Sequence, residues 1–272
     1  MRLAWATDIH LNFVPVVERC RFYDSVRQQA DALVVSGDIG ESQSIGYFLK
    51  EMERHIERPV YFVLGNHDFY NGSIADTRFQ VAHLVRESRN LVYLSQAGVV
   101  ELTSTTALVG HDGWADARLG DYDHSEAIKI VNDYQYIAEL RQWEDSATPD
   151  KAAIRKVLHA LGDEAARRLA ADLPQAATNH DQVIVATHVP PFREAAWHEG
   201  RPSDDNYLPH LSCKAVGGAL LGAARSYPRC KLLVLCGHTH GGGELAVLDN
   251  LQVLTGPAEY GKPEIQRIIE VN

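Results

Sequence analysis

The stretch VYFVLGNHD, residues 60–68, decides the fold of this 272-residue chain. A short apolar run ends at a glycine, and the polar residues Asn66, His67 and Asp68 follow it. Four further runs have the same form: LAWAT before DIH, ALVVS before GD, VIVAT before a histidine, and LLVLC before GHTH, over residues 3–7, 32–36, 183–187 and 232–236. Because the runs are brief, partly β-branched and not alternating, they predict strands buried on both faces.

Helical stretches lie between the first three strands. Residues 16–30 and 45–56 have helix-like spacing, so strand, helix and strand alternate, which predicts a parallel sheet with right-handed crossovers. Later runs are closer together, at residues 91–94, 99–102, 107–109, 245–248, 252–254 and 265–271. These indicate hairpins, hence a mixed sheet or a second sheet, and Asp249-Asn250 suits a two-residue hairpin turn.

A helical insert is expected at residues 125–173, inside a single domain that spans residues 1–272. One helix is predicted over residues 130–140. Thr148-Pro149 then resembles a cap followed by proline at the first position of a second helix. That helix would bury apolar residues from Ile154 to Leu169. The pair forms either a lid or a packing element without a role at the site.

Composition excludes several classes of protein. The chain is 45% hydrophobic and 23% charged, which suits a folded core, and its net charge of -10 argues against duplex nucleic acid as a partner. Its four cysteines form no CxxC pair. We find no signal peptide and no apolar run long enough for a bilayer, so we expect a cytoplasmic protein without a membrane partner.

The polar residues at the strand ends suggest a metal centre. The carboxyl ends of parallel strands share one edge of a sheet, so these loops are expected to converge. Imidazole and carboxylate together suit first-row transition metals. There are seven candidate ligands, too many for one ion: Asp8, His10, Asp38, Asn66, His188, His238 and His240. Two ions about 4 Å apart can clamp a bridging hydroxide and a phosphoryl oxygen.

The local spacing supports this interpretation. Residues two apart on an extended segment point the same way, so Asp8 and His10 can face one centre, as can His238 and His240. A glycine precedes the ligands at positions 38, 66 and 238, where it permits unusual backbone angles and close approach.

At this point the pattern resembles the calcineurin-like metallophosphoesterases, whose motifs are D-x-H, G-D, G-N-H-[DE], a single H and G-H-x-H. All five occur here in that order, from residue 8 to residue 240. The resemblance implies an α/β fold, a four-layer α/β/β/α sandwich with two mixed sheets flanked by helices. It also implies hydrolysis of a phosphate ester by a hydroxide that bridges two metal ions.

The resemblance also implies a role for each residue. Asp8, His10 and His240 would hold one metal, Asn66, His188 and His238 the other, and Asp38 would bridge them. His67 would stabilise the transferring phosphoryl group or protonate the leaving oxygen, and Asp68 would orient His67 through a hydrogen bond to its ring. Manganese, iron, zinc, cobalt and nickel all suit such ligands, and we favour manganese.

Other residues are weaker candidates. His111, Arg193 and Arg201 could contact substrate, since a guanidinium matches phosphate geometry. A packed turn explains His111 at least as well, and for each arginine we favour ordinary exposure to solvent. Tyr70 could border the site.

Two better-known branches of the family do not match. Protein Ser/Thr phosphatases carry an arginine after Gly-Asp and a Glu after Asn-His, whereas Glu41 and Asp68 stand near those places here. Glu41 also replaces the metal-binding tyrosine of purple acid phosphatases. We therefore favour a phosphodiester of small-molecule or nucleotide-like type. A phosphomonoesterase or protein phosphatase of the same fold, a metal-dependent amidohydrolase and a non-catalytic metal-stabilised binding protein are the alternatives.

Overall fold

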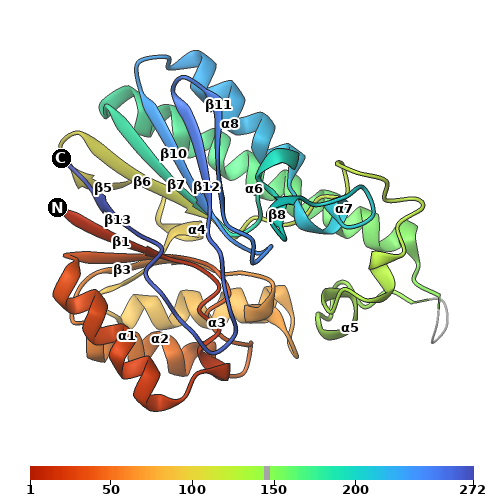
Figure 1. The fold of residues 1–272 in the computed structure, drawn as a ribbon, viewed down its shortest axis with the longest axis horizontal. Helices are drawn as coiled ribbons and strands as arrows, with labels where there is room; N and C mark the ends of the chain where they lie inside the picture. The colour runs from red at the N-terminus through yellow and green to blue at the C-terminus, as the bar shows by residue number, and fades with distance from the viewer. Residues whose placement is uncertain (144–147) are drawn as a thin grey trace.

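Two β-sheets face each other in the computed structural model, which describes residues 1–143 and 148–272 (Figure 1). The first sheet has five strands in the order β13 (Arg267–Glu270), β1 (Arg2–Ala6), β2 (Ala32–Ser36), β3 (Val60–Val63) and β4 (Leu91–Tyr93). Strands β1 to β4 are parallel, and β13 runs antiparallel to β1. The predicted parallel sheet is therefore present, with one antiparallel edge strand.

The second sheet has six strands, in the order β11 (Gly243–Leu248), β12 (Leu251–Thr255), β10 (Lys231–Cys236), β7 (Gln182–Thr187), β6 (Thr106–His111) and β5 (Val100–Thr103). The four central strands are parallel, while the edge strands β11 and β5 pair antiparallel with β12 and β6. A separate two-stranded hairpin joins β8 (Trp197–His198) to β9 (Arg201–Pro202). Both large sheets are thus mixed.

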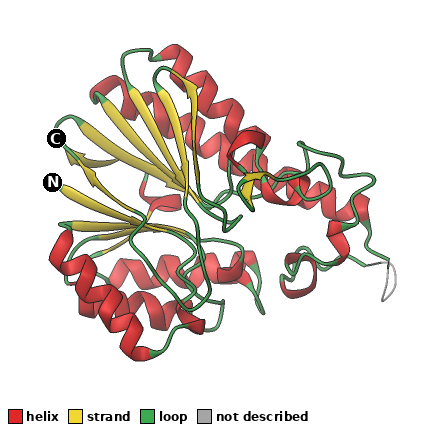
Figure 2. Ribbon diagram, viewed as in Figure 1, coloured by secondary structure: helices red, strands yellow, loops and turns green. Residues whose placement is uncertain are grey.

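Helices cover the outer face of each sheet (Figure 2). The helices α1 (Val16–Gln29), α2 (Ile45–Ile56) and α3 (Ile74–Glu87) lie on the five-stranded side, and α6 (Lys151–Asn179) and α8 (Lys214–Ser226) lie on the six-stranded side. Three short helices are α4 (Leu94–Ala97), α5 (Asp133–Tyr136) and α7 (Leu208–Leu211). The predicted four-layer sandwich is confirmed. None of the described helices is long and apolar enough to cross a membrane.

The central strands are mostly apolar because each sheet is covered on both faces. Leu3, Trp5 and Val34 of the first sheet pack against Ile184 and Leu235 of the second in a cluster between the sheets. The alternate residues along the same strands face the helices. This packing explains the non-alternating runs of the sequence.

The hairpin predictions are confirmed in part. Strands β5 and β6 form a hairpin, as do β11 and β12 about the turn at Asp249-Asn250. The prediction is wrong for the other two runs. Strand β4 pairs in parallel with β3, and β13 pairs with β1 at the opposite end of the chain. Short spacing along the sequence predicts pairing between neighbouring runs, so it could not identify partners that lie far away in the sequence.

Of the two helices predicted at residues 125–173, the second is confirmed and the first is wrong. Over residues 130–140 there is only the single turn α5, and residues 144–147 lie outside the described part of the chain. Helix α6 begins at Lys151, not at Pro149, because the side chain of Asp150 caps it by accepting from the Ala153 amide at 2.9 Å. Helix α6 continues to Asn179 and packs against α8 and β6, so it is a layer of the sandwich.

Tertiary contacts stop a longer helix from forming around α5. The Ala138 amide donates to the Gly72 carbonyl at 3.0 Å, and the Asn71 amide donates to the Tyr136 carbonyl at 2.9 Å. These backbone groups are thus committed to the loop that follows β3. The segment is anchored to that loop, which carries the Gly-Asn-His-Asp motif.

A buried ion pair joins α1 to α2. The Arg19 guanidinium donates to both carboxylate oxygens of Glu51, at 2.7 and 3.0 Å. Tyr23 and Tyr47 donate to the same carboxylate at 2.8 and 2.9 Å. Burial raises the pKa of Glu51, but these hydrogen bonds outweigh it and lower the pKa to about 2.

We predict that Glu51→Gln destabilises the protein by roughly 3 kcal/mol at neutral pH, the free energy that corresponds to this pKa shift. Because the folded pKa is depressed, the contribution of Glu51 is complete above its unfolded pKa of 4.5 and is lost as the pH falls towards about 2. Urea unfolding of both proteins at several pH values measures this. A difference in stability that does not shrink with acid would contradict the prediction.

Candidate metal centre

The loops that leave five strands meet at one edge of the two sheets. Asp8 and His10 follow β1, Asp38 follows β2, Asn66 follows β3, His188 follows β7, and His238 and His240 follow β10. Backbone hydrogen bonds join the loops, since the His10 amide donates to the Asp38 carbonyl at 2.9 Å and the Gly237 amide to the His188 carbonyl at 2.9 Å. All seven candidate ligands predicted from the sequence are brought together.

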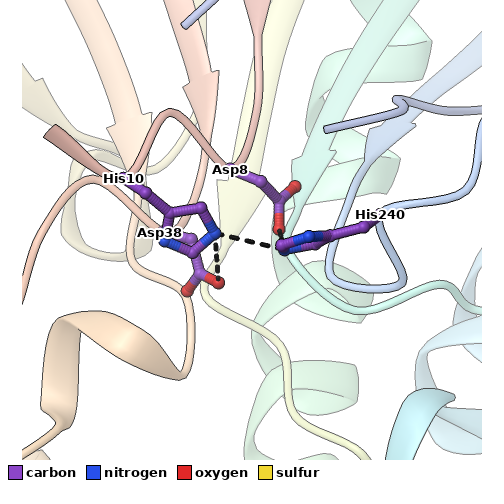
Figure 3. A group of neighbouring side chains, drawn as sticks. All are labelled: Asp8, His10, Asp38 and His240. Carbon is purple, nitrogen blue, oxygen red and sulfur yellow. Dashed lines mark hydrogen bonds and ion pairs between the residues drawn. The ribbon is translucent and has the colours of Figure 1, made fainter. Parts of the chain in front are cut away.

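One group of donors consists of Asp8, His10, Asp38 and His240, whose ligand atoms all lie within 4.8 Å of one another (Figure 3). The Nε2 atoms of His10 and His240 are 3.1 Å apart. Nε2 of His240 lies 3.5 Å from Oδ1 of Asp8, and Nε2 of His10 lies 3.7 Å from Oδ2 of Asp38. Two imidazoles and two carboxylates therefore point into one small space.

A second group forms around the amide oxygen of Asn66. Its Oδ1 lies 2.9 Å from Nε2 of His188 and 2.9 Å from Nδ1 of His238. Oδ1 of Asp38 lies 3.3 Å from the same Nε2 of His188. The two oxygens of Asp38 thus face different groups, so this carboxylate stands between them.

Backbone carbonyls set which nitrogen of each imidazole faces inward. Nδ1 of His188 lies 2.9 Å from the Ser36 carbonyl, and Nε2 of His238 lies 3.1 Å from the His210 carbonyl. A ring nitrogen that bonds a carbonyl oxygen must carry the proton. The other nitrogen of each ring faces the space beside Asn66, where its lone pair would bind a metal ion, which is the arrangement of metal-binding histidines.

The donor set fits transition-metal ions. Ligands at about 2.0–2.1 Å from an ion lie about 3–3.5 Å from each other. The separations of 2.9 Å around Asn66 and of 3.1 and 3.5 Å around His240 are close to that range. Nitrogen and oxygen donors without thiolate favour manganese, iron, zinc, cobalt or nickel.

Electrostatics point to positive charge beside Asp38. Burial raises the pKa of Asp38, but His188 and His67 hold it well below its usual range. Burial lowers the pKa of His188, yet Asp38 and Asp8 raise it to about 10. The pKa of His10 falls to about 4 because of burial, so this ring stays neutral. Either a protonated His188 or a divalent cation would stabilise the ionised carboxylate of Asp38.

The backbone is strained at five of the seven candidate ligands. Asp8, His10, Asp38, His238 and His240 have φ between 39° and 69°, in the left-handed region. Such conformations cost of the order of 1–3 kcal/mol each in non-glycine residues and cluster at functional sites. The strain therefore marks the same edge of the sheets as the ligand cluster does.

Two glycines that precede ligands leave room for their side chains. A Cβ atom at Gly65 would lie 2.1 Å from Oδ1 of Asp38, and one at Gly237 would lie 1.9 Å from Oδ2 of Asp8. The close approach that the sequence suggested for these glycines is present, and no other residue fits at either position without moving a ligand.

Comparison with known proteins agrees with this geometry. Residues 1–242 match the calcineurin-like phosphoesterase family. This chain belongs to that family. It is accordingly a phosphate-ester hydrolase. No curated protein matches the chain in sequence.

Several solved structures have a similar fold. Phosphopantetheinyl hydrolase from Mycobacterium tuberculosis has a TM-score of 0.64 and 15% identity, over 96% of this chain and 90% of that one. A dimetal phosphatase from Danio rerio has a TM-score of 0.57 and 16% identity, over 94% of this chain and 87% of that one. At these identities the likeness concerns the fold.

The structure corrects the role predicted for Asp68. Its fully buried carboxylate accepts from the amides of Ile39, Gly40 and Gly65 at 2.9, 2.7 and 2.8 Å. Both oxygens are thus engaged by backbone and not by the ring of His67. Burial, with repulsion from Asp38, raises the pKa of Asp68 to about 8. Asp68 joins the loop after β2 to the loop after β3. The sequence could not predict this role, because the partners are backbone amides of another loop.

His67 is oriented by other contacts. Its ring stacks on Tyr70, with centroids 4.2 Å apart and planes at 28°, and meets His10 edge-on at 4.6 Å. The His67 amide donates to Oδ1 of Asp38 at 2.9 Å. Tyr70 therefore borders the site, as the sequence suggested, and holds the ring of His67 in place.

A cavity of about 730 Å³ opens over the ligands. His67, His238 and His240 form its base, and the β8–β9 hairpin, with Arg201, forms one wall. A larger cleft of about 910 Å³ lies beside α1, away from all the candidate ligands.

Two predicted substrate contacts do not reach the cavity. His111 ends β6 and is buried, where its Nδ1 accepts from the Gly113 amide at 3.1 Å. Arg193 pairs with Asp205 at 2.5 Å. Of the three substrate contacts predicted from the sequence, only Arg201 lines the cavity.

Three important residues were missed. Asp112 is fully buried and accepts from Leu64, Tyr93 and Arg78, while its carbonyl accepts from the His188 amide. Asp133 reaches Asn66 from α5. Tyr260 lies 4.5 Å from His10, ring to ring. It follows the carboxyl end of β12, a parallel strand at the same edge of the sheet. This position after a strand end is the sequence feature from which Tyr260 could have been predicted to lie near the site.

We predict that Gly65→Ala abolishes metal binding, because the new methyl group would overlap Asp38 and lie 2.7 Å from Cε1 of His188. Gly218→Ala is the control, since a Cβ there meets nothing within 4 Å, and alanine stabilises a helix by about 0.5–1 kcal/mol relative to glycine. Elemental analysis and thermal unfolding measure both effects. Normal metal content in the Gly65 variant would contradict the prediction.

Proposed function

We propose that this enzyme hydrolyses a phosphodiester with two divalent metal ions, one in each donor group. The observation that carries the proposal is the position of Asp38. Its Oδ2 lies 3.7 Å from Nε2 of His10, and its Oδ1 lies 3.3 Å from Nε2 of His188. A carboxylate placed in this way can serve two neighbouring ions at once.

The ligands divide between the two groups. Asp8, His10 and His240 would hold the first ion, Asn66, His188 and His238 would hold the second, and Asp38 would be shared. Bound ions would supply Lewis acidity, which polarises a phosphoryl oxygen and lowers the pKa of water at the site. We favour manganese among the metals that suit this donor set. The dimetal phosphatase of similar fold supports the number of ions.

His67 is proposed as the group that protonates the leaving oxygen. It lines the cavity beside both donor groups. The Tyr70 stack and the bond from its amide to Asp38 hold it in place. A positioned proton donor of this kind contributes about 10²- to 10⁴-fold to a rate.

The charge of the cavity favours a diester. Among the described residues that line it, Arg201 is the single arginine or lysine, whereas Glu199 and Asp204 are acidic. A diester carries one negative charge and a monoester two near neutral pH, so this wall receives the diester at lower electrostatic cost. Val131, Leu211 and Tyr260 offer apolar contact to an organic substituent.

We propose a small-molecule or nucleotide-like ester as the substrate, because the cavity volume of about 730 Å³ is that of an ordinary small-ligand site. The net charge of -10 disfavours a duplex nucleic acid. A single domain and a cytoplasmic location stay predictions from the sequence.

We predict that the manganese-loaded protein hydrolyses bis(p-nitrophenyl) phosphate with at least about tenfold higher kcat/KM than p-nitrophenyl phosphate, which corresponds to 1.4 kcal/mol of discrimination. Release of p-nitrophenol measures both reactions. A preference for the monoester would identify a phosphomonoesterase and overturn the diester assignment. Binding of two equivalents of metal without hydrolysis of either ester would contradict a catalytic site.

We predict that His67→Ala lowers kcat by about 10²- to 10⁴-fold and leaves two equivalents of metal bound, because the side chain moves a proton and is not a ligand. Asp38→Ala is the contrasting variant and should lose both ions. Steady-state kinetics and elemental analysis separate the two effects. Loss of metal from the His67 variant would show that its assigned role is wrong.

A further inference from the structure

The side-chain amide of Asn66 has two chemically different ends that point in opposite directions. Its oxygen lies 2.9 Å from both His188 Nε2 and His238 Nδ1, within the second donor group. Its nitrogen donates to Oδ1 of Asp133 at 2.8 Å and to the Tyr70 hydroxyl at 3.2 Å. Rotation of the amide by half a turn would direct the NH₂ group at the centre, where it cannot bind a cation.

Asp133 fixes the orientation of this amide. Its side chain comes from α5, a segment 67 residues further along the chain, and the residue is only 5% exposed. Its Oδ1 accepts only, so it selects the NH₂ end of Asn66. Hydrogen bonds to an ionised acceptor are roughly twice as strong as those between neutral groups, particularly away from water.

The same oxygen of Asp133 also holds Tyr70. The Tyr70 hydroxyl donates to Oδ1 of Asp133 at 2.8 Å, and its ring stacks on His67. One buried carboxylate therefore contacts both residues that flank the assigned proton donor. The backbone bonds from Asn71 to Tyr136 and from Ala138 to Gly72 keep α5 in register with this loop.

We propose that Asp133 is a positioning residue of the metal centre, which sets the orientation of Asn66 and thereby the affinity for one of the two ions. The inference rests on the proposed function. In this proposal the α5 segment orients a metal ligand. That role differs from both functions considered for the segment from the sequence, a lid and a packing element. Because Asp133 touches Asn66 and none of the first donor group, its effect is confined to the second ion.

The test is a calorimetric titration of the metal-free full chain with Mn²⁺. In Asp133→Ala we expect one of the two binding steps to weaken by about 10- to 100-fold, the usual effect of losing a group that orients a metal ligand, while the other step is unchanged. Asp116→Ala is the matched control. Asp116 is also fully buried and accepts from the Ala215 amide, away from the centre. It should lower thermal stability and leave both binding steps intact.

A double-mutant cycle separates orientation of Asn66 from general loosening of the structure. In an Asn66→Ala background, adding Asp133→Ala should change manganese binding no further. Tyr70→Phe should leave both binding steps near those of the wild type, because Asp133 still holds the amide. An additional loss in the double variant, or equal weakening of both steps in Asp133→Ala, would overturn the proposal.

A second variant covers the case in which Asp133→Ala does not fold. Asp133→Asn keeps the shape and a neutral acceptor, so we expect about fivefold weakening of the same single step. Unchanged binding in this folded variant would overturn the proposal. Failure of the wild type to bind two equivalents would instead contradict the proposed function, so the two failures are distinguishable.

Discussion

The charge of Asp38 is the constraint on which the rest of the site depends. This carboxylate is 1% exposed and lies near two further buried carboxylates, Asp8 and Asp68. An isolated buried charge of this kind costs several kcal/mol, so the surrounding chain must supply donors or cations. Backbone amides and imidazoles surround these carboxylates, and glycines at the strand ends leave room for them. The arrangement of the candidate ligands follows from the need to stabilise these buried charges.

The two sheets supply the stability that offsets local strain. Five ligands adopt left-handed backbone angles that a β-strand or helix would not tolerate. They persist because each follows a largely buried strand that pairs with a neighbour on both sides. The loops are also linked to each other, as when the His238 amide donates to both oxygens of Asp8 at 3.0 and 3.1 Å. The rigid layers thus hold in place a geometry that the loops alone could not maintain.

The sequence predicted the features that follow from short-range pattern and sheet topology. The strand runs before Asp8, Asp38 and Asn66 were found because parallel strands buried on both faces have a distinctive composition, and their shared edge brought the ligands together. Contacts between residues far apart in the sequence were not predicted. Strand β13 reaches β1 across the whole chain, and the carboxylate of Asp68 bonds to backbone amides that no residue type reveals. Propensity also suggested a longer helix around α5, where tertiary hydrogen bonds prevail.

The metal ligands and the cavity wall lie on different parts of the fold. This separation explains how one metal centre can serve enzymes with different substrates. The ligands lie on strand ends, where any displacement disturbs two sheets. The cavity wall, in contrast, is built from the β8–β9 hairpin and the loop that carries Tyr260, which lie beyond the strand ends. Substitutions in that wall change charge and shape without moving a ligand. Asp133 connects the two parts, because it is the first residue of α5, two positions after the cavity residue Val131, and its carboxylate accepts a hydrogen bond from Asn66.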